Sequence, residues 1–337
     1  MTSPSNFERS FVWSVGSVEA PEVITSAWID EQLVETLERC AVRPGLLESV
    51  AGITERRWWP DGVSFDEAAA RAGSRALEAA GIAPHEVDLL ISTSVSKHHL
   101  EPSVACAVHF RLGLSSTCMN FDLGNACLGF LDAMKVAAMA IETGQARTVL
   151  IVDGEGSRAV QLATIERLRQ PSATTSDVFD QFASLTLGSG AAAMVMGGPR
   201  TGAHQLLGGI SRAATTHHDL CVGDLDNMRT DTAGLLEGGL ALARQAFDDA
   251  LEEGWQWRDC DRYVMHQISA VHTAKLCELL GIPMDRVPLT YPNFGNMGPA
   301  AIPYTLSTVV SDIAAGERVL LMGIGSGLNC AALEILW

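Results

Sequence analysis

The chain has 337 residues, 47% of them hydrophobic and 19% charged, which is enough for a large buried core and two domains. Its formal net charge of −17 disfavours nucleic acid and anionic membrane surfaces as partners. No apolar run reaches the ~20 residues of a membrane span, residues 1–10 lack the pattern of a signal peptide, and the 8 cysteines include no CxxC pair. We therefore expect a cytoplasmic, reduced protein without a disulfide framework, a metal site or a cofactor.

The first predicted elements recur about half the chain later. An alanine-rich helix is predicted over 66–80 and an apolar strand over 86–96, and the same order returns as a helix over 239–253 and a strand over 259–269. This self-similarity predicts an internal duplication. Helices that alternate with buried strands also predict mainly parallel strands, covered by helices on both faces.

A second pair of strands supports the duplication. The strand predicted over 146–152 is similar to the one predicted over 317–322, which precedes the glycine-rich stretch 323–327. This second match is approximate, so general α/β alternation explains it as well. Between the halves, the segment 197–202 reads Gly-Gly-Pro-Arg-Thr-Gly, which is typical of a hinge.

Cys127 follows an apolar, strand-like stretch and precedes a helical pattern that begins at Leu128. The positive end of the helix dipole favours the thiolate at this place, and hence nucleophilic attack. Most cysteines are buried structural residues, and that alternative fits Cys127 when it is considered alone. His266 lies near the end of the second duplicated strand, and Asn296 precedes a helix that begins near Pro299. Because ligands of such sheets bind beyond the carboxyl ends of strands, we expect these three residues to share one site.

In this order, Cys127, His266 and Asn296 resemble the Cys-His-Asn set of thiolase-superfamily condensing enzymes, in particular the ketoacyl synthase III type. The resemblance continues through most of the chain, in the segments 51–57, 187–193 and 323–329. It implies an α/β thiolase fold, a duplicated five-layered αβαβα arrangement of two halves related by a pseudo-twofold axis. The implied halves are residues 1–199, with an inserted helical segment at about 155–185, and residues 200–337.

Within this group the sequence is more similar to the OleA family, the long-chain acyl-CoA condensing enzymes of bacterial olefin synthesis. The similar segments are 94–96, 100–103, 125–128 and 325–330. Fatty-acid-initiating synthases usually carry HQANxR after the catalytic histidine, whereas this chain has Val271 in place of the arginine. That arginine is associated with docking of a carrier protein. Its absence, together with the acidic net charge, disfavours a carrier-protein substrate.

The resemblance implies a role for each site residue. Cys127 accepts the acyl group as a thioester, and the backbone N–H groups of Cys127 and Ser326 hold the tetrahedral oxyanion. Loss of one such donor typically costs ~10²–10³ in rate. His266 and Asn296 donate to the carbonyl of the second substrate, which becomes enolate-like when its α-proton leaves. Considered singly, each has a structural alternative: a satisfied strand-end histidine and an ordinary Gly-Asn turn.

Glu101 matches the glutamate that OleA enzymes contribute across the dimer interface. A condensation without decarboxylation needs a base for the α-proton, and the resemblance implies that Glu101 is this base. A solvated glutamate has a pKa of about 4.3 and is a weak base, so we expect burial to raise the pKa of Glu101. The alternative is an ordinary surface carboxylate in a loop before a proline.

Arg56 and Arg57 are candidates for contacts with the phosphates of CoA. Paired arginines more often lie on a solvated loop, which is the alternative for this pair. We expect no metal ligands, because neither the paired histidines nor the carboxylates form a cluster with ligand spacing.

The resemblance therefore implies a homodimeric acyltransferase that joins two fatty acyl-CoA molecules through a Cys127 thioester and yields a 2-alkyl-3-keto acid. Such a product leads to an olefin or a β-lactone. Two alternatives remain open. One is a ketoacyl synthase III that condenses acyl-CoA with malonyl-carrier protein. The other is a supporting subunit that lends Glu101 to a sister chain in a heterodimer.

Overall fold

The computed structural model describes residues 5–224 and 226–337. Their strands form one 10-stranded sheet and two 2-stranded sheets. In spatial order the large sheet contains β12 (Arg262–Met265), β13 (Arg318–Gly325), β14 (Asn329–Leu336), β9 (His204–Ala213), β2 (Phe11–Glu19), β8 (Gly190–Gly197), β7 (Thr148–Glu155), β5 (Leu89–Ser92) and β6 (Met119–Asp122), with β1 (Ser5–Asn6) beside β9. The small sheets pair β3 (Glu22–Thr25) with β4 (Glu55–Trp58), and β10 (Cys221–Gly223) with β11 (Met228–Thr230).

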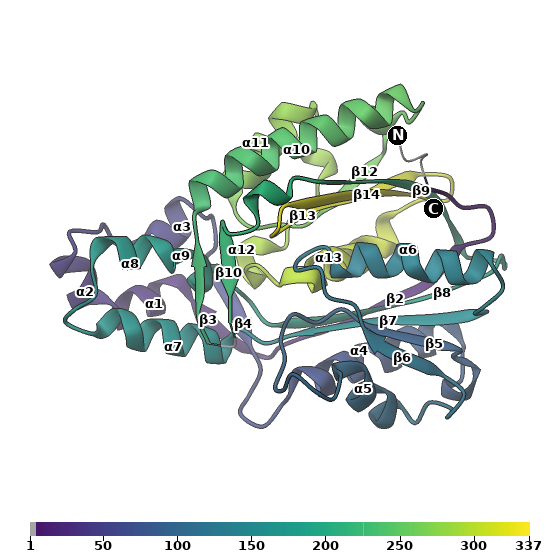
Figure 1. Ribbon diagram of the computed structural model, residues 1–337, viewed down its shortest axis with the longest axis horizontal. Coiled ribbons are helices and arrows are strands. Elements are labelled where there is room, and N and C mark those ends of the chain that lie inside the picture. The colour runs from purple at the N-terminus through teal and green to yellow at the C-terminus, as the bar shows by residue number, and fades with distance from the viewer. Residues whose placement is uncertain (1–4, 225) are drawn as a thin grey trace.

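The large sheet folds over so that helices lie between its two parts as well as outside them (Figure 1). One outer layer contains α4 (Phe65–Ala80) and α5 (Val104–Leu112), the middle layer α6 (Gly129–Glu142) and α13 (Ala301–Val309), and the other outer layer α10 (Thr232–Glu252) and α11 (Ala270–Leu280). The two parts are joined where β2 pairs with β9. This arrangement is the expected αβαβα thiolase fold.

The prediction of mainly parallel strands is wrong. The parallel pairs are β5 with β6, β5 with β7, and β12 with β13, whereas β8, β9 and β14 pair with their neighbours in antiparallel fashion. The strands are continuous apolar runs because helices cover both faces of each part of the sheet. That burial pattern resembles a parallel sheet even where the strands run in opposite directions.

The duplicated helices begin at side-chain caps. The Ser64 hydroxyl accepts a hydrogen bond from the Glu67 N–H at the start of α4, which spans nearly the predicted range. α10 begins at Thr232, earlier than the predicted start at 239. The Asp231 carboxylate caps it by accepting the Gly234 N–H, and the helix continues through the glycine pair Gly238-Gly239. α4 packs closely on β2, since a Cβ added at Gly16 would lie 2.8 Å from the backbone nitrogen of Ala76.

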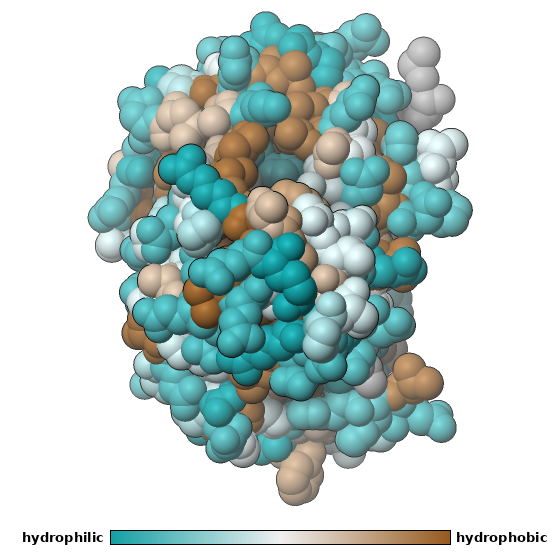
Figure 2. Space-filling view, turned by 90° about the vertical axis from the view of Figure 1, so that its left-hand side faces the viewer, coloured by the Kyte–Doolittle hydropathy of each residue, from teal (hydrophilic) through white to brown (hydrophobic). Residues whose placement is uncertain are grey.

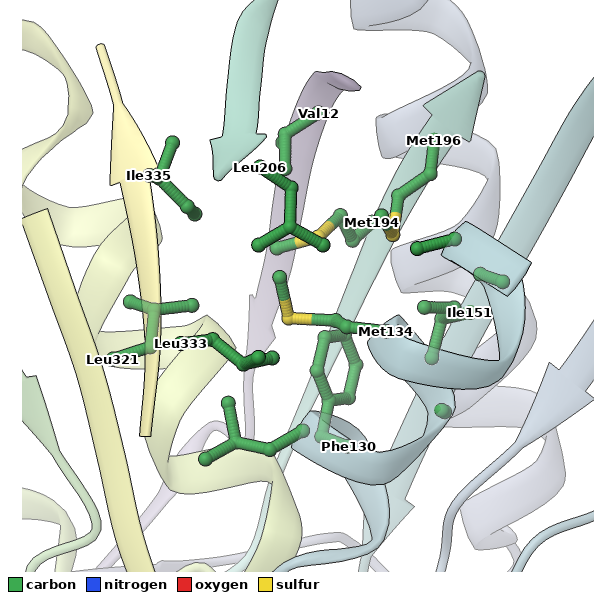
Figure 3. Close-up of a cluster of buried hydrophobic side chains, with 14 of the residues drawn as sticks. Val12, Phe130, Met134, Ile151, Met194, Met196, Leu206, Leu321, Leu333 and Ile335 are labelled. Carbon is green, nitrogen blue, oxygen red and sulfur yellow. The ribbon is translucent and has the colours of Figure 1, made fainter. Parts of the chain in front are cut away.

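The middle-layer helix α6 lies in the core of the molecule. Its side chains Phe130 and Met134 lie between Met194 on one part of the sheet and Leu321 and Leu333 on the other (Figure 3). All five of these side chains are fully buried. The residues just before α6 are therefore held by packing from both halves.

A group of short helices projects from one side of this body, at the left of Figure 1. It contains α7 (Arg158–Arg169), α8 (Thr175–Asp180) and α9 (Phe182–Thr186), and also α1 (Ser26–Gln32), α2 (Val34–Arg39) and α3 (Leu46–Ser49) from the N-terminal region. The group has a small core of its own, formed by Ile29, Leu33, Leu37, Ile165, Leu168 and Val178. The sequence predicted its second segment but not the contribution of the first.

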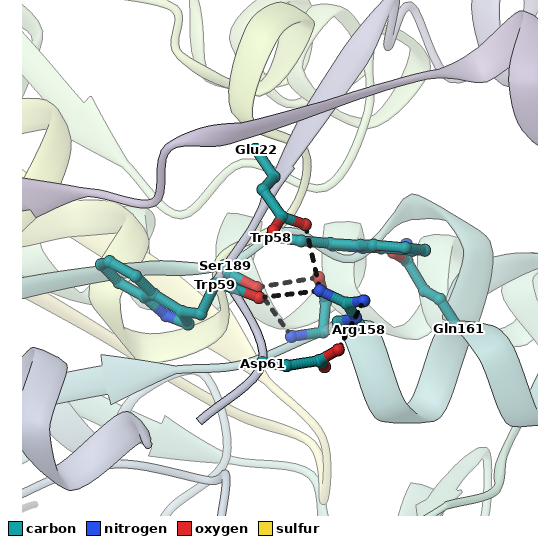
Figure 4. A network of polar contacts seen from close by, with 8 residues as sticks. Glu22, Trp58, Trp59, Asp61, Arg158, Gln161 and Ser189 are labelled. Carbon is teal, nitrogen blue, oxygen red and sulfur yellow. Dashed lines mark hydrogen bonds and ion pairs between the residues drawn. The ribbon is translucent and has the colours of Figure 1, made fainter. Parts of the chain in front are cut away.

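A polar network fixes these helices to β4 (Figure 4). The Trp58 Nε1 donates to Gln161 Oε1 at 2.5 Å, and the Gln161 amide donates to the carbonyls of Ser184, Leu185 and Leu187. Arg158 stacks on the Trp58 ring at 5.5 Å from its centroid and pairs with Glu22. Every polar atom of the Gln161 side chain is thus satisfied inside the protein.

The remaining helices are short: α12 (Tyr291–Phe294), η1 (Pro84–Glu86), η2 (Thr215–His217), η3 (Trp257–Asp259), η4 (Met284–Arg286), η5 (Gly298–Ala300) and η6 (Val310–Asp312). None of the described helices is long and apolar enough to cross a membrane. The described residues also contain no group of three or more His, Cys, Asp or Glu side chains that could hold a metal ion.

Candidate active site

Cys127 lies in a tight turn between β6 and α6. The Leu128 N–H donates to the Asn125 carbonyl at 3.0 Å, and Ala126 has a φ of +44°, which is unusual for a residue with a side chain. A Cβ added at Gly129 would lie 3.1 Å from the Thr93 carbonyl, so a larger residue would press α6 against the end of β5. The turn therefore places Cys127 at the carboxyl edge of the strands, as predicted.

The Cys127 thiol is protonated in the free protein. Burial raises the pKa of Cys127 to about 12, and the nearby Cys221, Glu155 and Asp153 raise it further. The prediction that the helix terminus favours the thiolate is wrong for this state, because desolvation and nearby acidic groups outweigh the helix dipole. The thiol must lose its proton during the reaction, and the neighbouring groups decide how.

His266 and Asn296 contact each other. The His266 N–H donates to the Met322 carbonyl at 2.9 Å, which fixes the residue at the end of β12. Its ring Nε2 lies 3.1 Å from Asn296 Oδ1, and that oxygen also accepts the Gly298 N–H at 2.9 Å. Because Asn296 Oδ1 accepts the Gly298 N–H and faces the His266 ring, the Asn296 amide nitrogen points elsewhere and can donate to a bound carbonyl.

His266 is neutral in this environment. Burial lowers the pKa of His266 to about 4, against a smaller opposing effect of the Asn296 hydrogen bond. A neutral imidazole can accept the proton of a thiol or donate a hydrogen bond to an oxygen. A charged imidazolium can do only the second.

The turn that contains Ser326 lies against the turn that contains Cys127. It connects β13 to β14, and a Cβ added at Gly325 would lie 3.3 Å from the Asn125 carbonyl and from the Leu128 side chain. Gly323 is similarly close to the residue that follows β12, because a Cβ added at Gly323 would lie 3.4 Å from His266 Cβ. The two loops that the resemblance names as oxyanion donors are thus neighbours.

Two asparagines join these loops, and the sequence analysis did not find them. The Asn329 amide donates to Asn125 Oδ1 at 3.2 Å, and the Asn125 amide donates to Asp132 Oδ2 at 2.6 Å. Asp132 lies in the first turn of α6, where a carboxylate is favoured by the helix dipole. The available signal was that one asparagine lies within a few residues of each candidate oxyanion donor.

Glu101 is not brought to this group within one chain. It lies in the segment 97–103 between β5 and α5 and is exposed, next to Leu100, which is 96% exposed. The burial expected for a base is therefore not supplied by its own chain. An exposed apolar side chain beside an exposed carboxylate is consistent with a surface that another molecule covers.

The positions of Arg56 and Arg57 do not fit contacts with CoA. Arg56 is 0% exposed, and its guanidinium donates to the Ile24 and Leu185 carbonyls, while burial lowers its pKa to about 10. Arg57 pairs with Glu19 at the end of β2 and with Glu55 on the small sheet. Both arginines hold secondary-structure elements together.

The face on the side of the projecting helices is hollowed. Figure 2 shows hydrophobic residues around a hollow in the upper part of this face, while most of its lower part is hydrophilic. A hollow with an apolar rim is the kind of surface that accepts an apolar chain.

Comparison with known proteins agrees with this geometry. The family models for 3-oxoacyl-[acyl-carrier-protein] synthase III match residues 121–166, and those for its C-terminal part match residues 251–337. An acyl-CoA:acyl-CoA alkyltransferase of Xanthomonas campestris is 40% identical over 98% of this chain and 99% of its own length. The chain belongs to the acyl-CoA:acyl-CoA alkyltransferase family.

Two further matches extend the comparison. The acyl-CoA:acyl-CoA alkyltransferase of Shewanella oneidensis is 32% identical over 98% of this chain and 99% of its own length. A solved structure of a cysteine-to-serine variant of Xanthomonas campestris OleA, with bound lauric acid and lauroyl-CoA, superposes with a TM-score of 0.96. It is 40% identical to this chain and covers 98% of it, with 100% of its own chain matched. Membership of this alkyltransferase family agrees with the thiolase fold and makes the chain an acyltransferase.

Proposed function

We propose that this alkyltransferase joins two fatty acyl-CoA molecules by a Claisen condensation without decarboxylation, as a homodimer. The observation that carries the proposal is that the turns of Cys127 and Ser326 are neighbours at one edge of the sheet, with the neutral His266–Asn296 pair beside them. The whole-length similarity to alkyltransferases supports it. The apolar rim of the hollow in Figure 2 suits a fatty acyl chain.

In the first step, the Cys127 sulfur attacks the thioester carbonyl of one acyl-CoA. The neutral His266 ring takes the thiol proton and passes it to the departing CoA sulfur, so that one C–S bond forms and one breaks. The backbone N–H groups of Cys127 and Ser326 stabilise the oxyanion of the tetrahedral intermediate. The products are an acyl-Cys127 thioester and free CoA.

In the second step, Glu101 of the partner subunit removes the α-proton of the second acyl-CoA. The electron pair is held as an enolate whose oxygen accepts hydrogen bonds from His266 and Asn296. The α-carbon attacks the acyl carbon on Cys127 and the new C–C bond forms. The Cys127 sulfur leaves as a thiolate and regains the proton that Glu101 removed. The product is a 2-alkyl-3-ketoacyl-CoA, which water hydrolyses to the 2-alkyl-3-keto acid and CoA.

The decisive experiment mixes the purified protein with lauroyl-CoA alone. We expect release of CoA and formation of a 2-alkyl-3-keto acid, or of the ketone left by its decarboxylation, detected by mass spectrometry. Formation of product only after malonyl-carrier protein is added would overturn the proposal in favour of a ketoacyl synthase III.

The alternative role of a supporting subunit is tested separately with the variant Cys127→Ala, which keeps Glu101. Loss of all product from this variant excludes a role limited to lending the glutamate. Unchanged product formation would show that the nucleophile lies in another chain.

A further inference from the structure

A buried carboxylate at the end of β7 has no part in the steps described so far. Glu155 is 7% exposed, and its carboxylate accepts three hydrogen bonds. Its Oε1 accepts the Val95 N–H at 2.6 Å, while its Oε2 accepts the Ser96 N–H at 3.2 Å and the Ser96 hydroxyl at 2.6 Å. These donors immediately precede the segment 97–103, which carries Glu101.

Side-chain hydrogen bonds join the two segments beyond the last backbone pair of β5 and β7. Backbone pairing of β5 with β7 ends at Ser92 and Val152. Beyond that point the Ser94 hydroxyl accepts the Gly154 N–H at 2.9 Å, and the Ser96 hydroxyl accepts the Gly156 N–H at 3.0 Å. Side-chain hydroxyls therefore hold residues 93–96 in register with residues 153–156 up to the start of the Glu101 segment.

Glu155 also faces the reaction site. A Cβ added at Gly298, two residues from Asn296, would lie 3.8 Å from its carboxyl carbon, and its charge is among those that raise the pKa of Cys127. Burial raises the pKa of Glu155 to about 7, while the hydrogen bonds from Ser96 and Val95 oppose that shift. A buried carboxylate is stabilised only by such bonds, so its position and that of the loop depend on each other.

We propose that Glu155 is a positioning residue whose carboxylate fixes the root of the segment 97–103, so that Glu101 enters the partner's site at the correct place. This inference rests on the proposed function, in which Glu101 is the base. Glu155 acts through Glu101 and exchanges no proton with the substrate. Its replacement therefore affects the condensation and spares the acylation of Cys127.

The test separates the two half-reactions. Acylation is followed as the first release of CoA together with the mass increase of the protein, and condensation as the yield of the 2-alkyl-3-keto acid from lauroyl-CoA. In Glu155→Gln we expect acylation to be no slower than in wild type, because the lost carboxylate charge is one of those that raise the pKa of Cys127. We expect condensation to fall by about 100-fold, the loss typical of a group misplaced by about 1 Å.

Asp88→Asn is the matched control. Asp88 is a carboxylate that also accepts backbone N–H groups between the same two strands, from Arg147 at 2.8 Å and Thr148 at 3.1 Å, but at their opposite ends. Both half-reactions should stay near wild type in this variant. An equal fall of acylation and condensation in Glu155→Gln, or no fall in condensation, overturns the proposal.

Two further variants make the result decisive. If Glu155→Gln does not fold, Ser96→Ala removes the hydroxyl from the same contact, and condensation alone should fall by about tenfold, the loss of one hydrogen bond to a charged group. Unchanged condensation in Ser96→Ala would then overturn the proposal. Glu101→Gln tests the proposed function independently, since normal condensation in this variant would remove Glu101 as the base whatever Glu155 does.

Discussion

The two halves of the molecule share a backbone arrangement but differ in the side chains at corresponding strand ends. The Thr93 N–H donates to the Val152 carbonyl at 2.9 Å in one half, and the His266 N–H donates to the Met322 carbonyl at 2.9 Å in the other. At the opposite strand ends, the Asp88 N–H donates to the Thr148 carbonyl at 3.0 Å.

The second half repeats this contact as well, because the Asp261 N–H donates to the Arg318 carbonyl at 2.9 Å. The difference begins one residue beyond each strand. Thr93 donates to the buried Asp153, while His266 contacts Asn296 in the candidate active site. A duplicated scaffold can therefore carry two unlike chemistries at equivalent positions, with the backbone unchanged.

The largest effect is expected when this difference is removed. His266→Thr gives the second half the residue of the first, and we expect condensation to fall by ~10²–10³, because the enolate oxygen loses one donor. Product yield from lauroyl-CoA measures the effect.

His109→Thr, which alters a histidine bonded to the Ser115 carbonyl away from the site, is the control and should stay near wild type. A threonine at position 266 that retained full condensation would show that the two strand ends are functionally equivalent.

The pH dependence of Cys127 alkylation tests how the surroundings of Cys127 set its pKa. Below the pKa of a thiol, the thiolate fraction rises about tenfold for each pH unit. With a pKa of about 12, alkylation of Cys127 by iodoacetamide should accelerate about 100-fold from pH 7 to pH 9 and continue to rise at pH 10.

An ordinary thiol, with a pKa of about 8.5, would instead approach a plateau in this range. Mass spectrometry of the peptide that contains Cys127 separates it from the exposed Cys106. A plateau below pH 9 would show that the helix dipole outweighs burial.

The link between the halves is tested at Asn329. In Asn329→Ala the Ser326 turn loses its hydrogen bond to Asn125, and we expect acylation to slow by about tenfold, less than the ~10²–10³ that a missing oxyanion donor costs.

Asn329→Asp is the informative companion, because it places an acceptor opposite Asn125 Oδ1 and should be slowed at least as much. The first release of CoA measures both variants. An aspartate variant as fast as wild type would contradict a role for this hydrogen bond.

The smallest effect is expected at Asp88 and Asp261, which make equivalent contacts in the two halves. Asp88→Asn and Asp261→Asn each replace a carboxylate by an amide and so weaken the hydrogen bond that it accepts from a backbone N–H, of Arg147 and of Arg318 respectively. We expect each to lower the free energy of unfolding by about 1 kcal/mol, with the two values similar. Urea unfolding followed by circular dichroism measures them. A difference of several kcal/mol would show that the duplication does not extend to stability.

Order and spacing along the chain predicted the parts of the site that follow from strand ends. Cys127, His266 and Asn296 each come directly after a strand or before a helix, and such places are visible as changes in hydrophobic period. The same reasoning located the glycines around Ser326. It could not predict that the Cys127 thiol is protonated, because the pKa of Cys127 depends on burial and on neighbouring groups such as Glu155, which lies at the end of another strand.

The unpredicted features depend on tertiary packing. Arg56 lies between two partly buried charged residues on a short strand, and nothing in its neighbours shows that the projecting helices will cover it. Those helices gather from segments 26–49 and 158–186, whose common core has no local signature. Antiparallel strands were mistaken for parallel ones because burial on both faces gives the same pattern.

The burial of α6 has a consequence for motion. The amide hydrogens of its buried face lie between both parts of the sheet, so we expect them to exchange with solvent only when the molecule opens. Cys127 is half-buried, and its turn leads directly into this protected helix. Any adjustment to acyl chains of different length must come from the surrounding loops and projecting helices, which can open locally while the nucleophile stays in place.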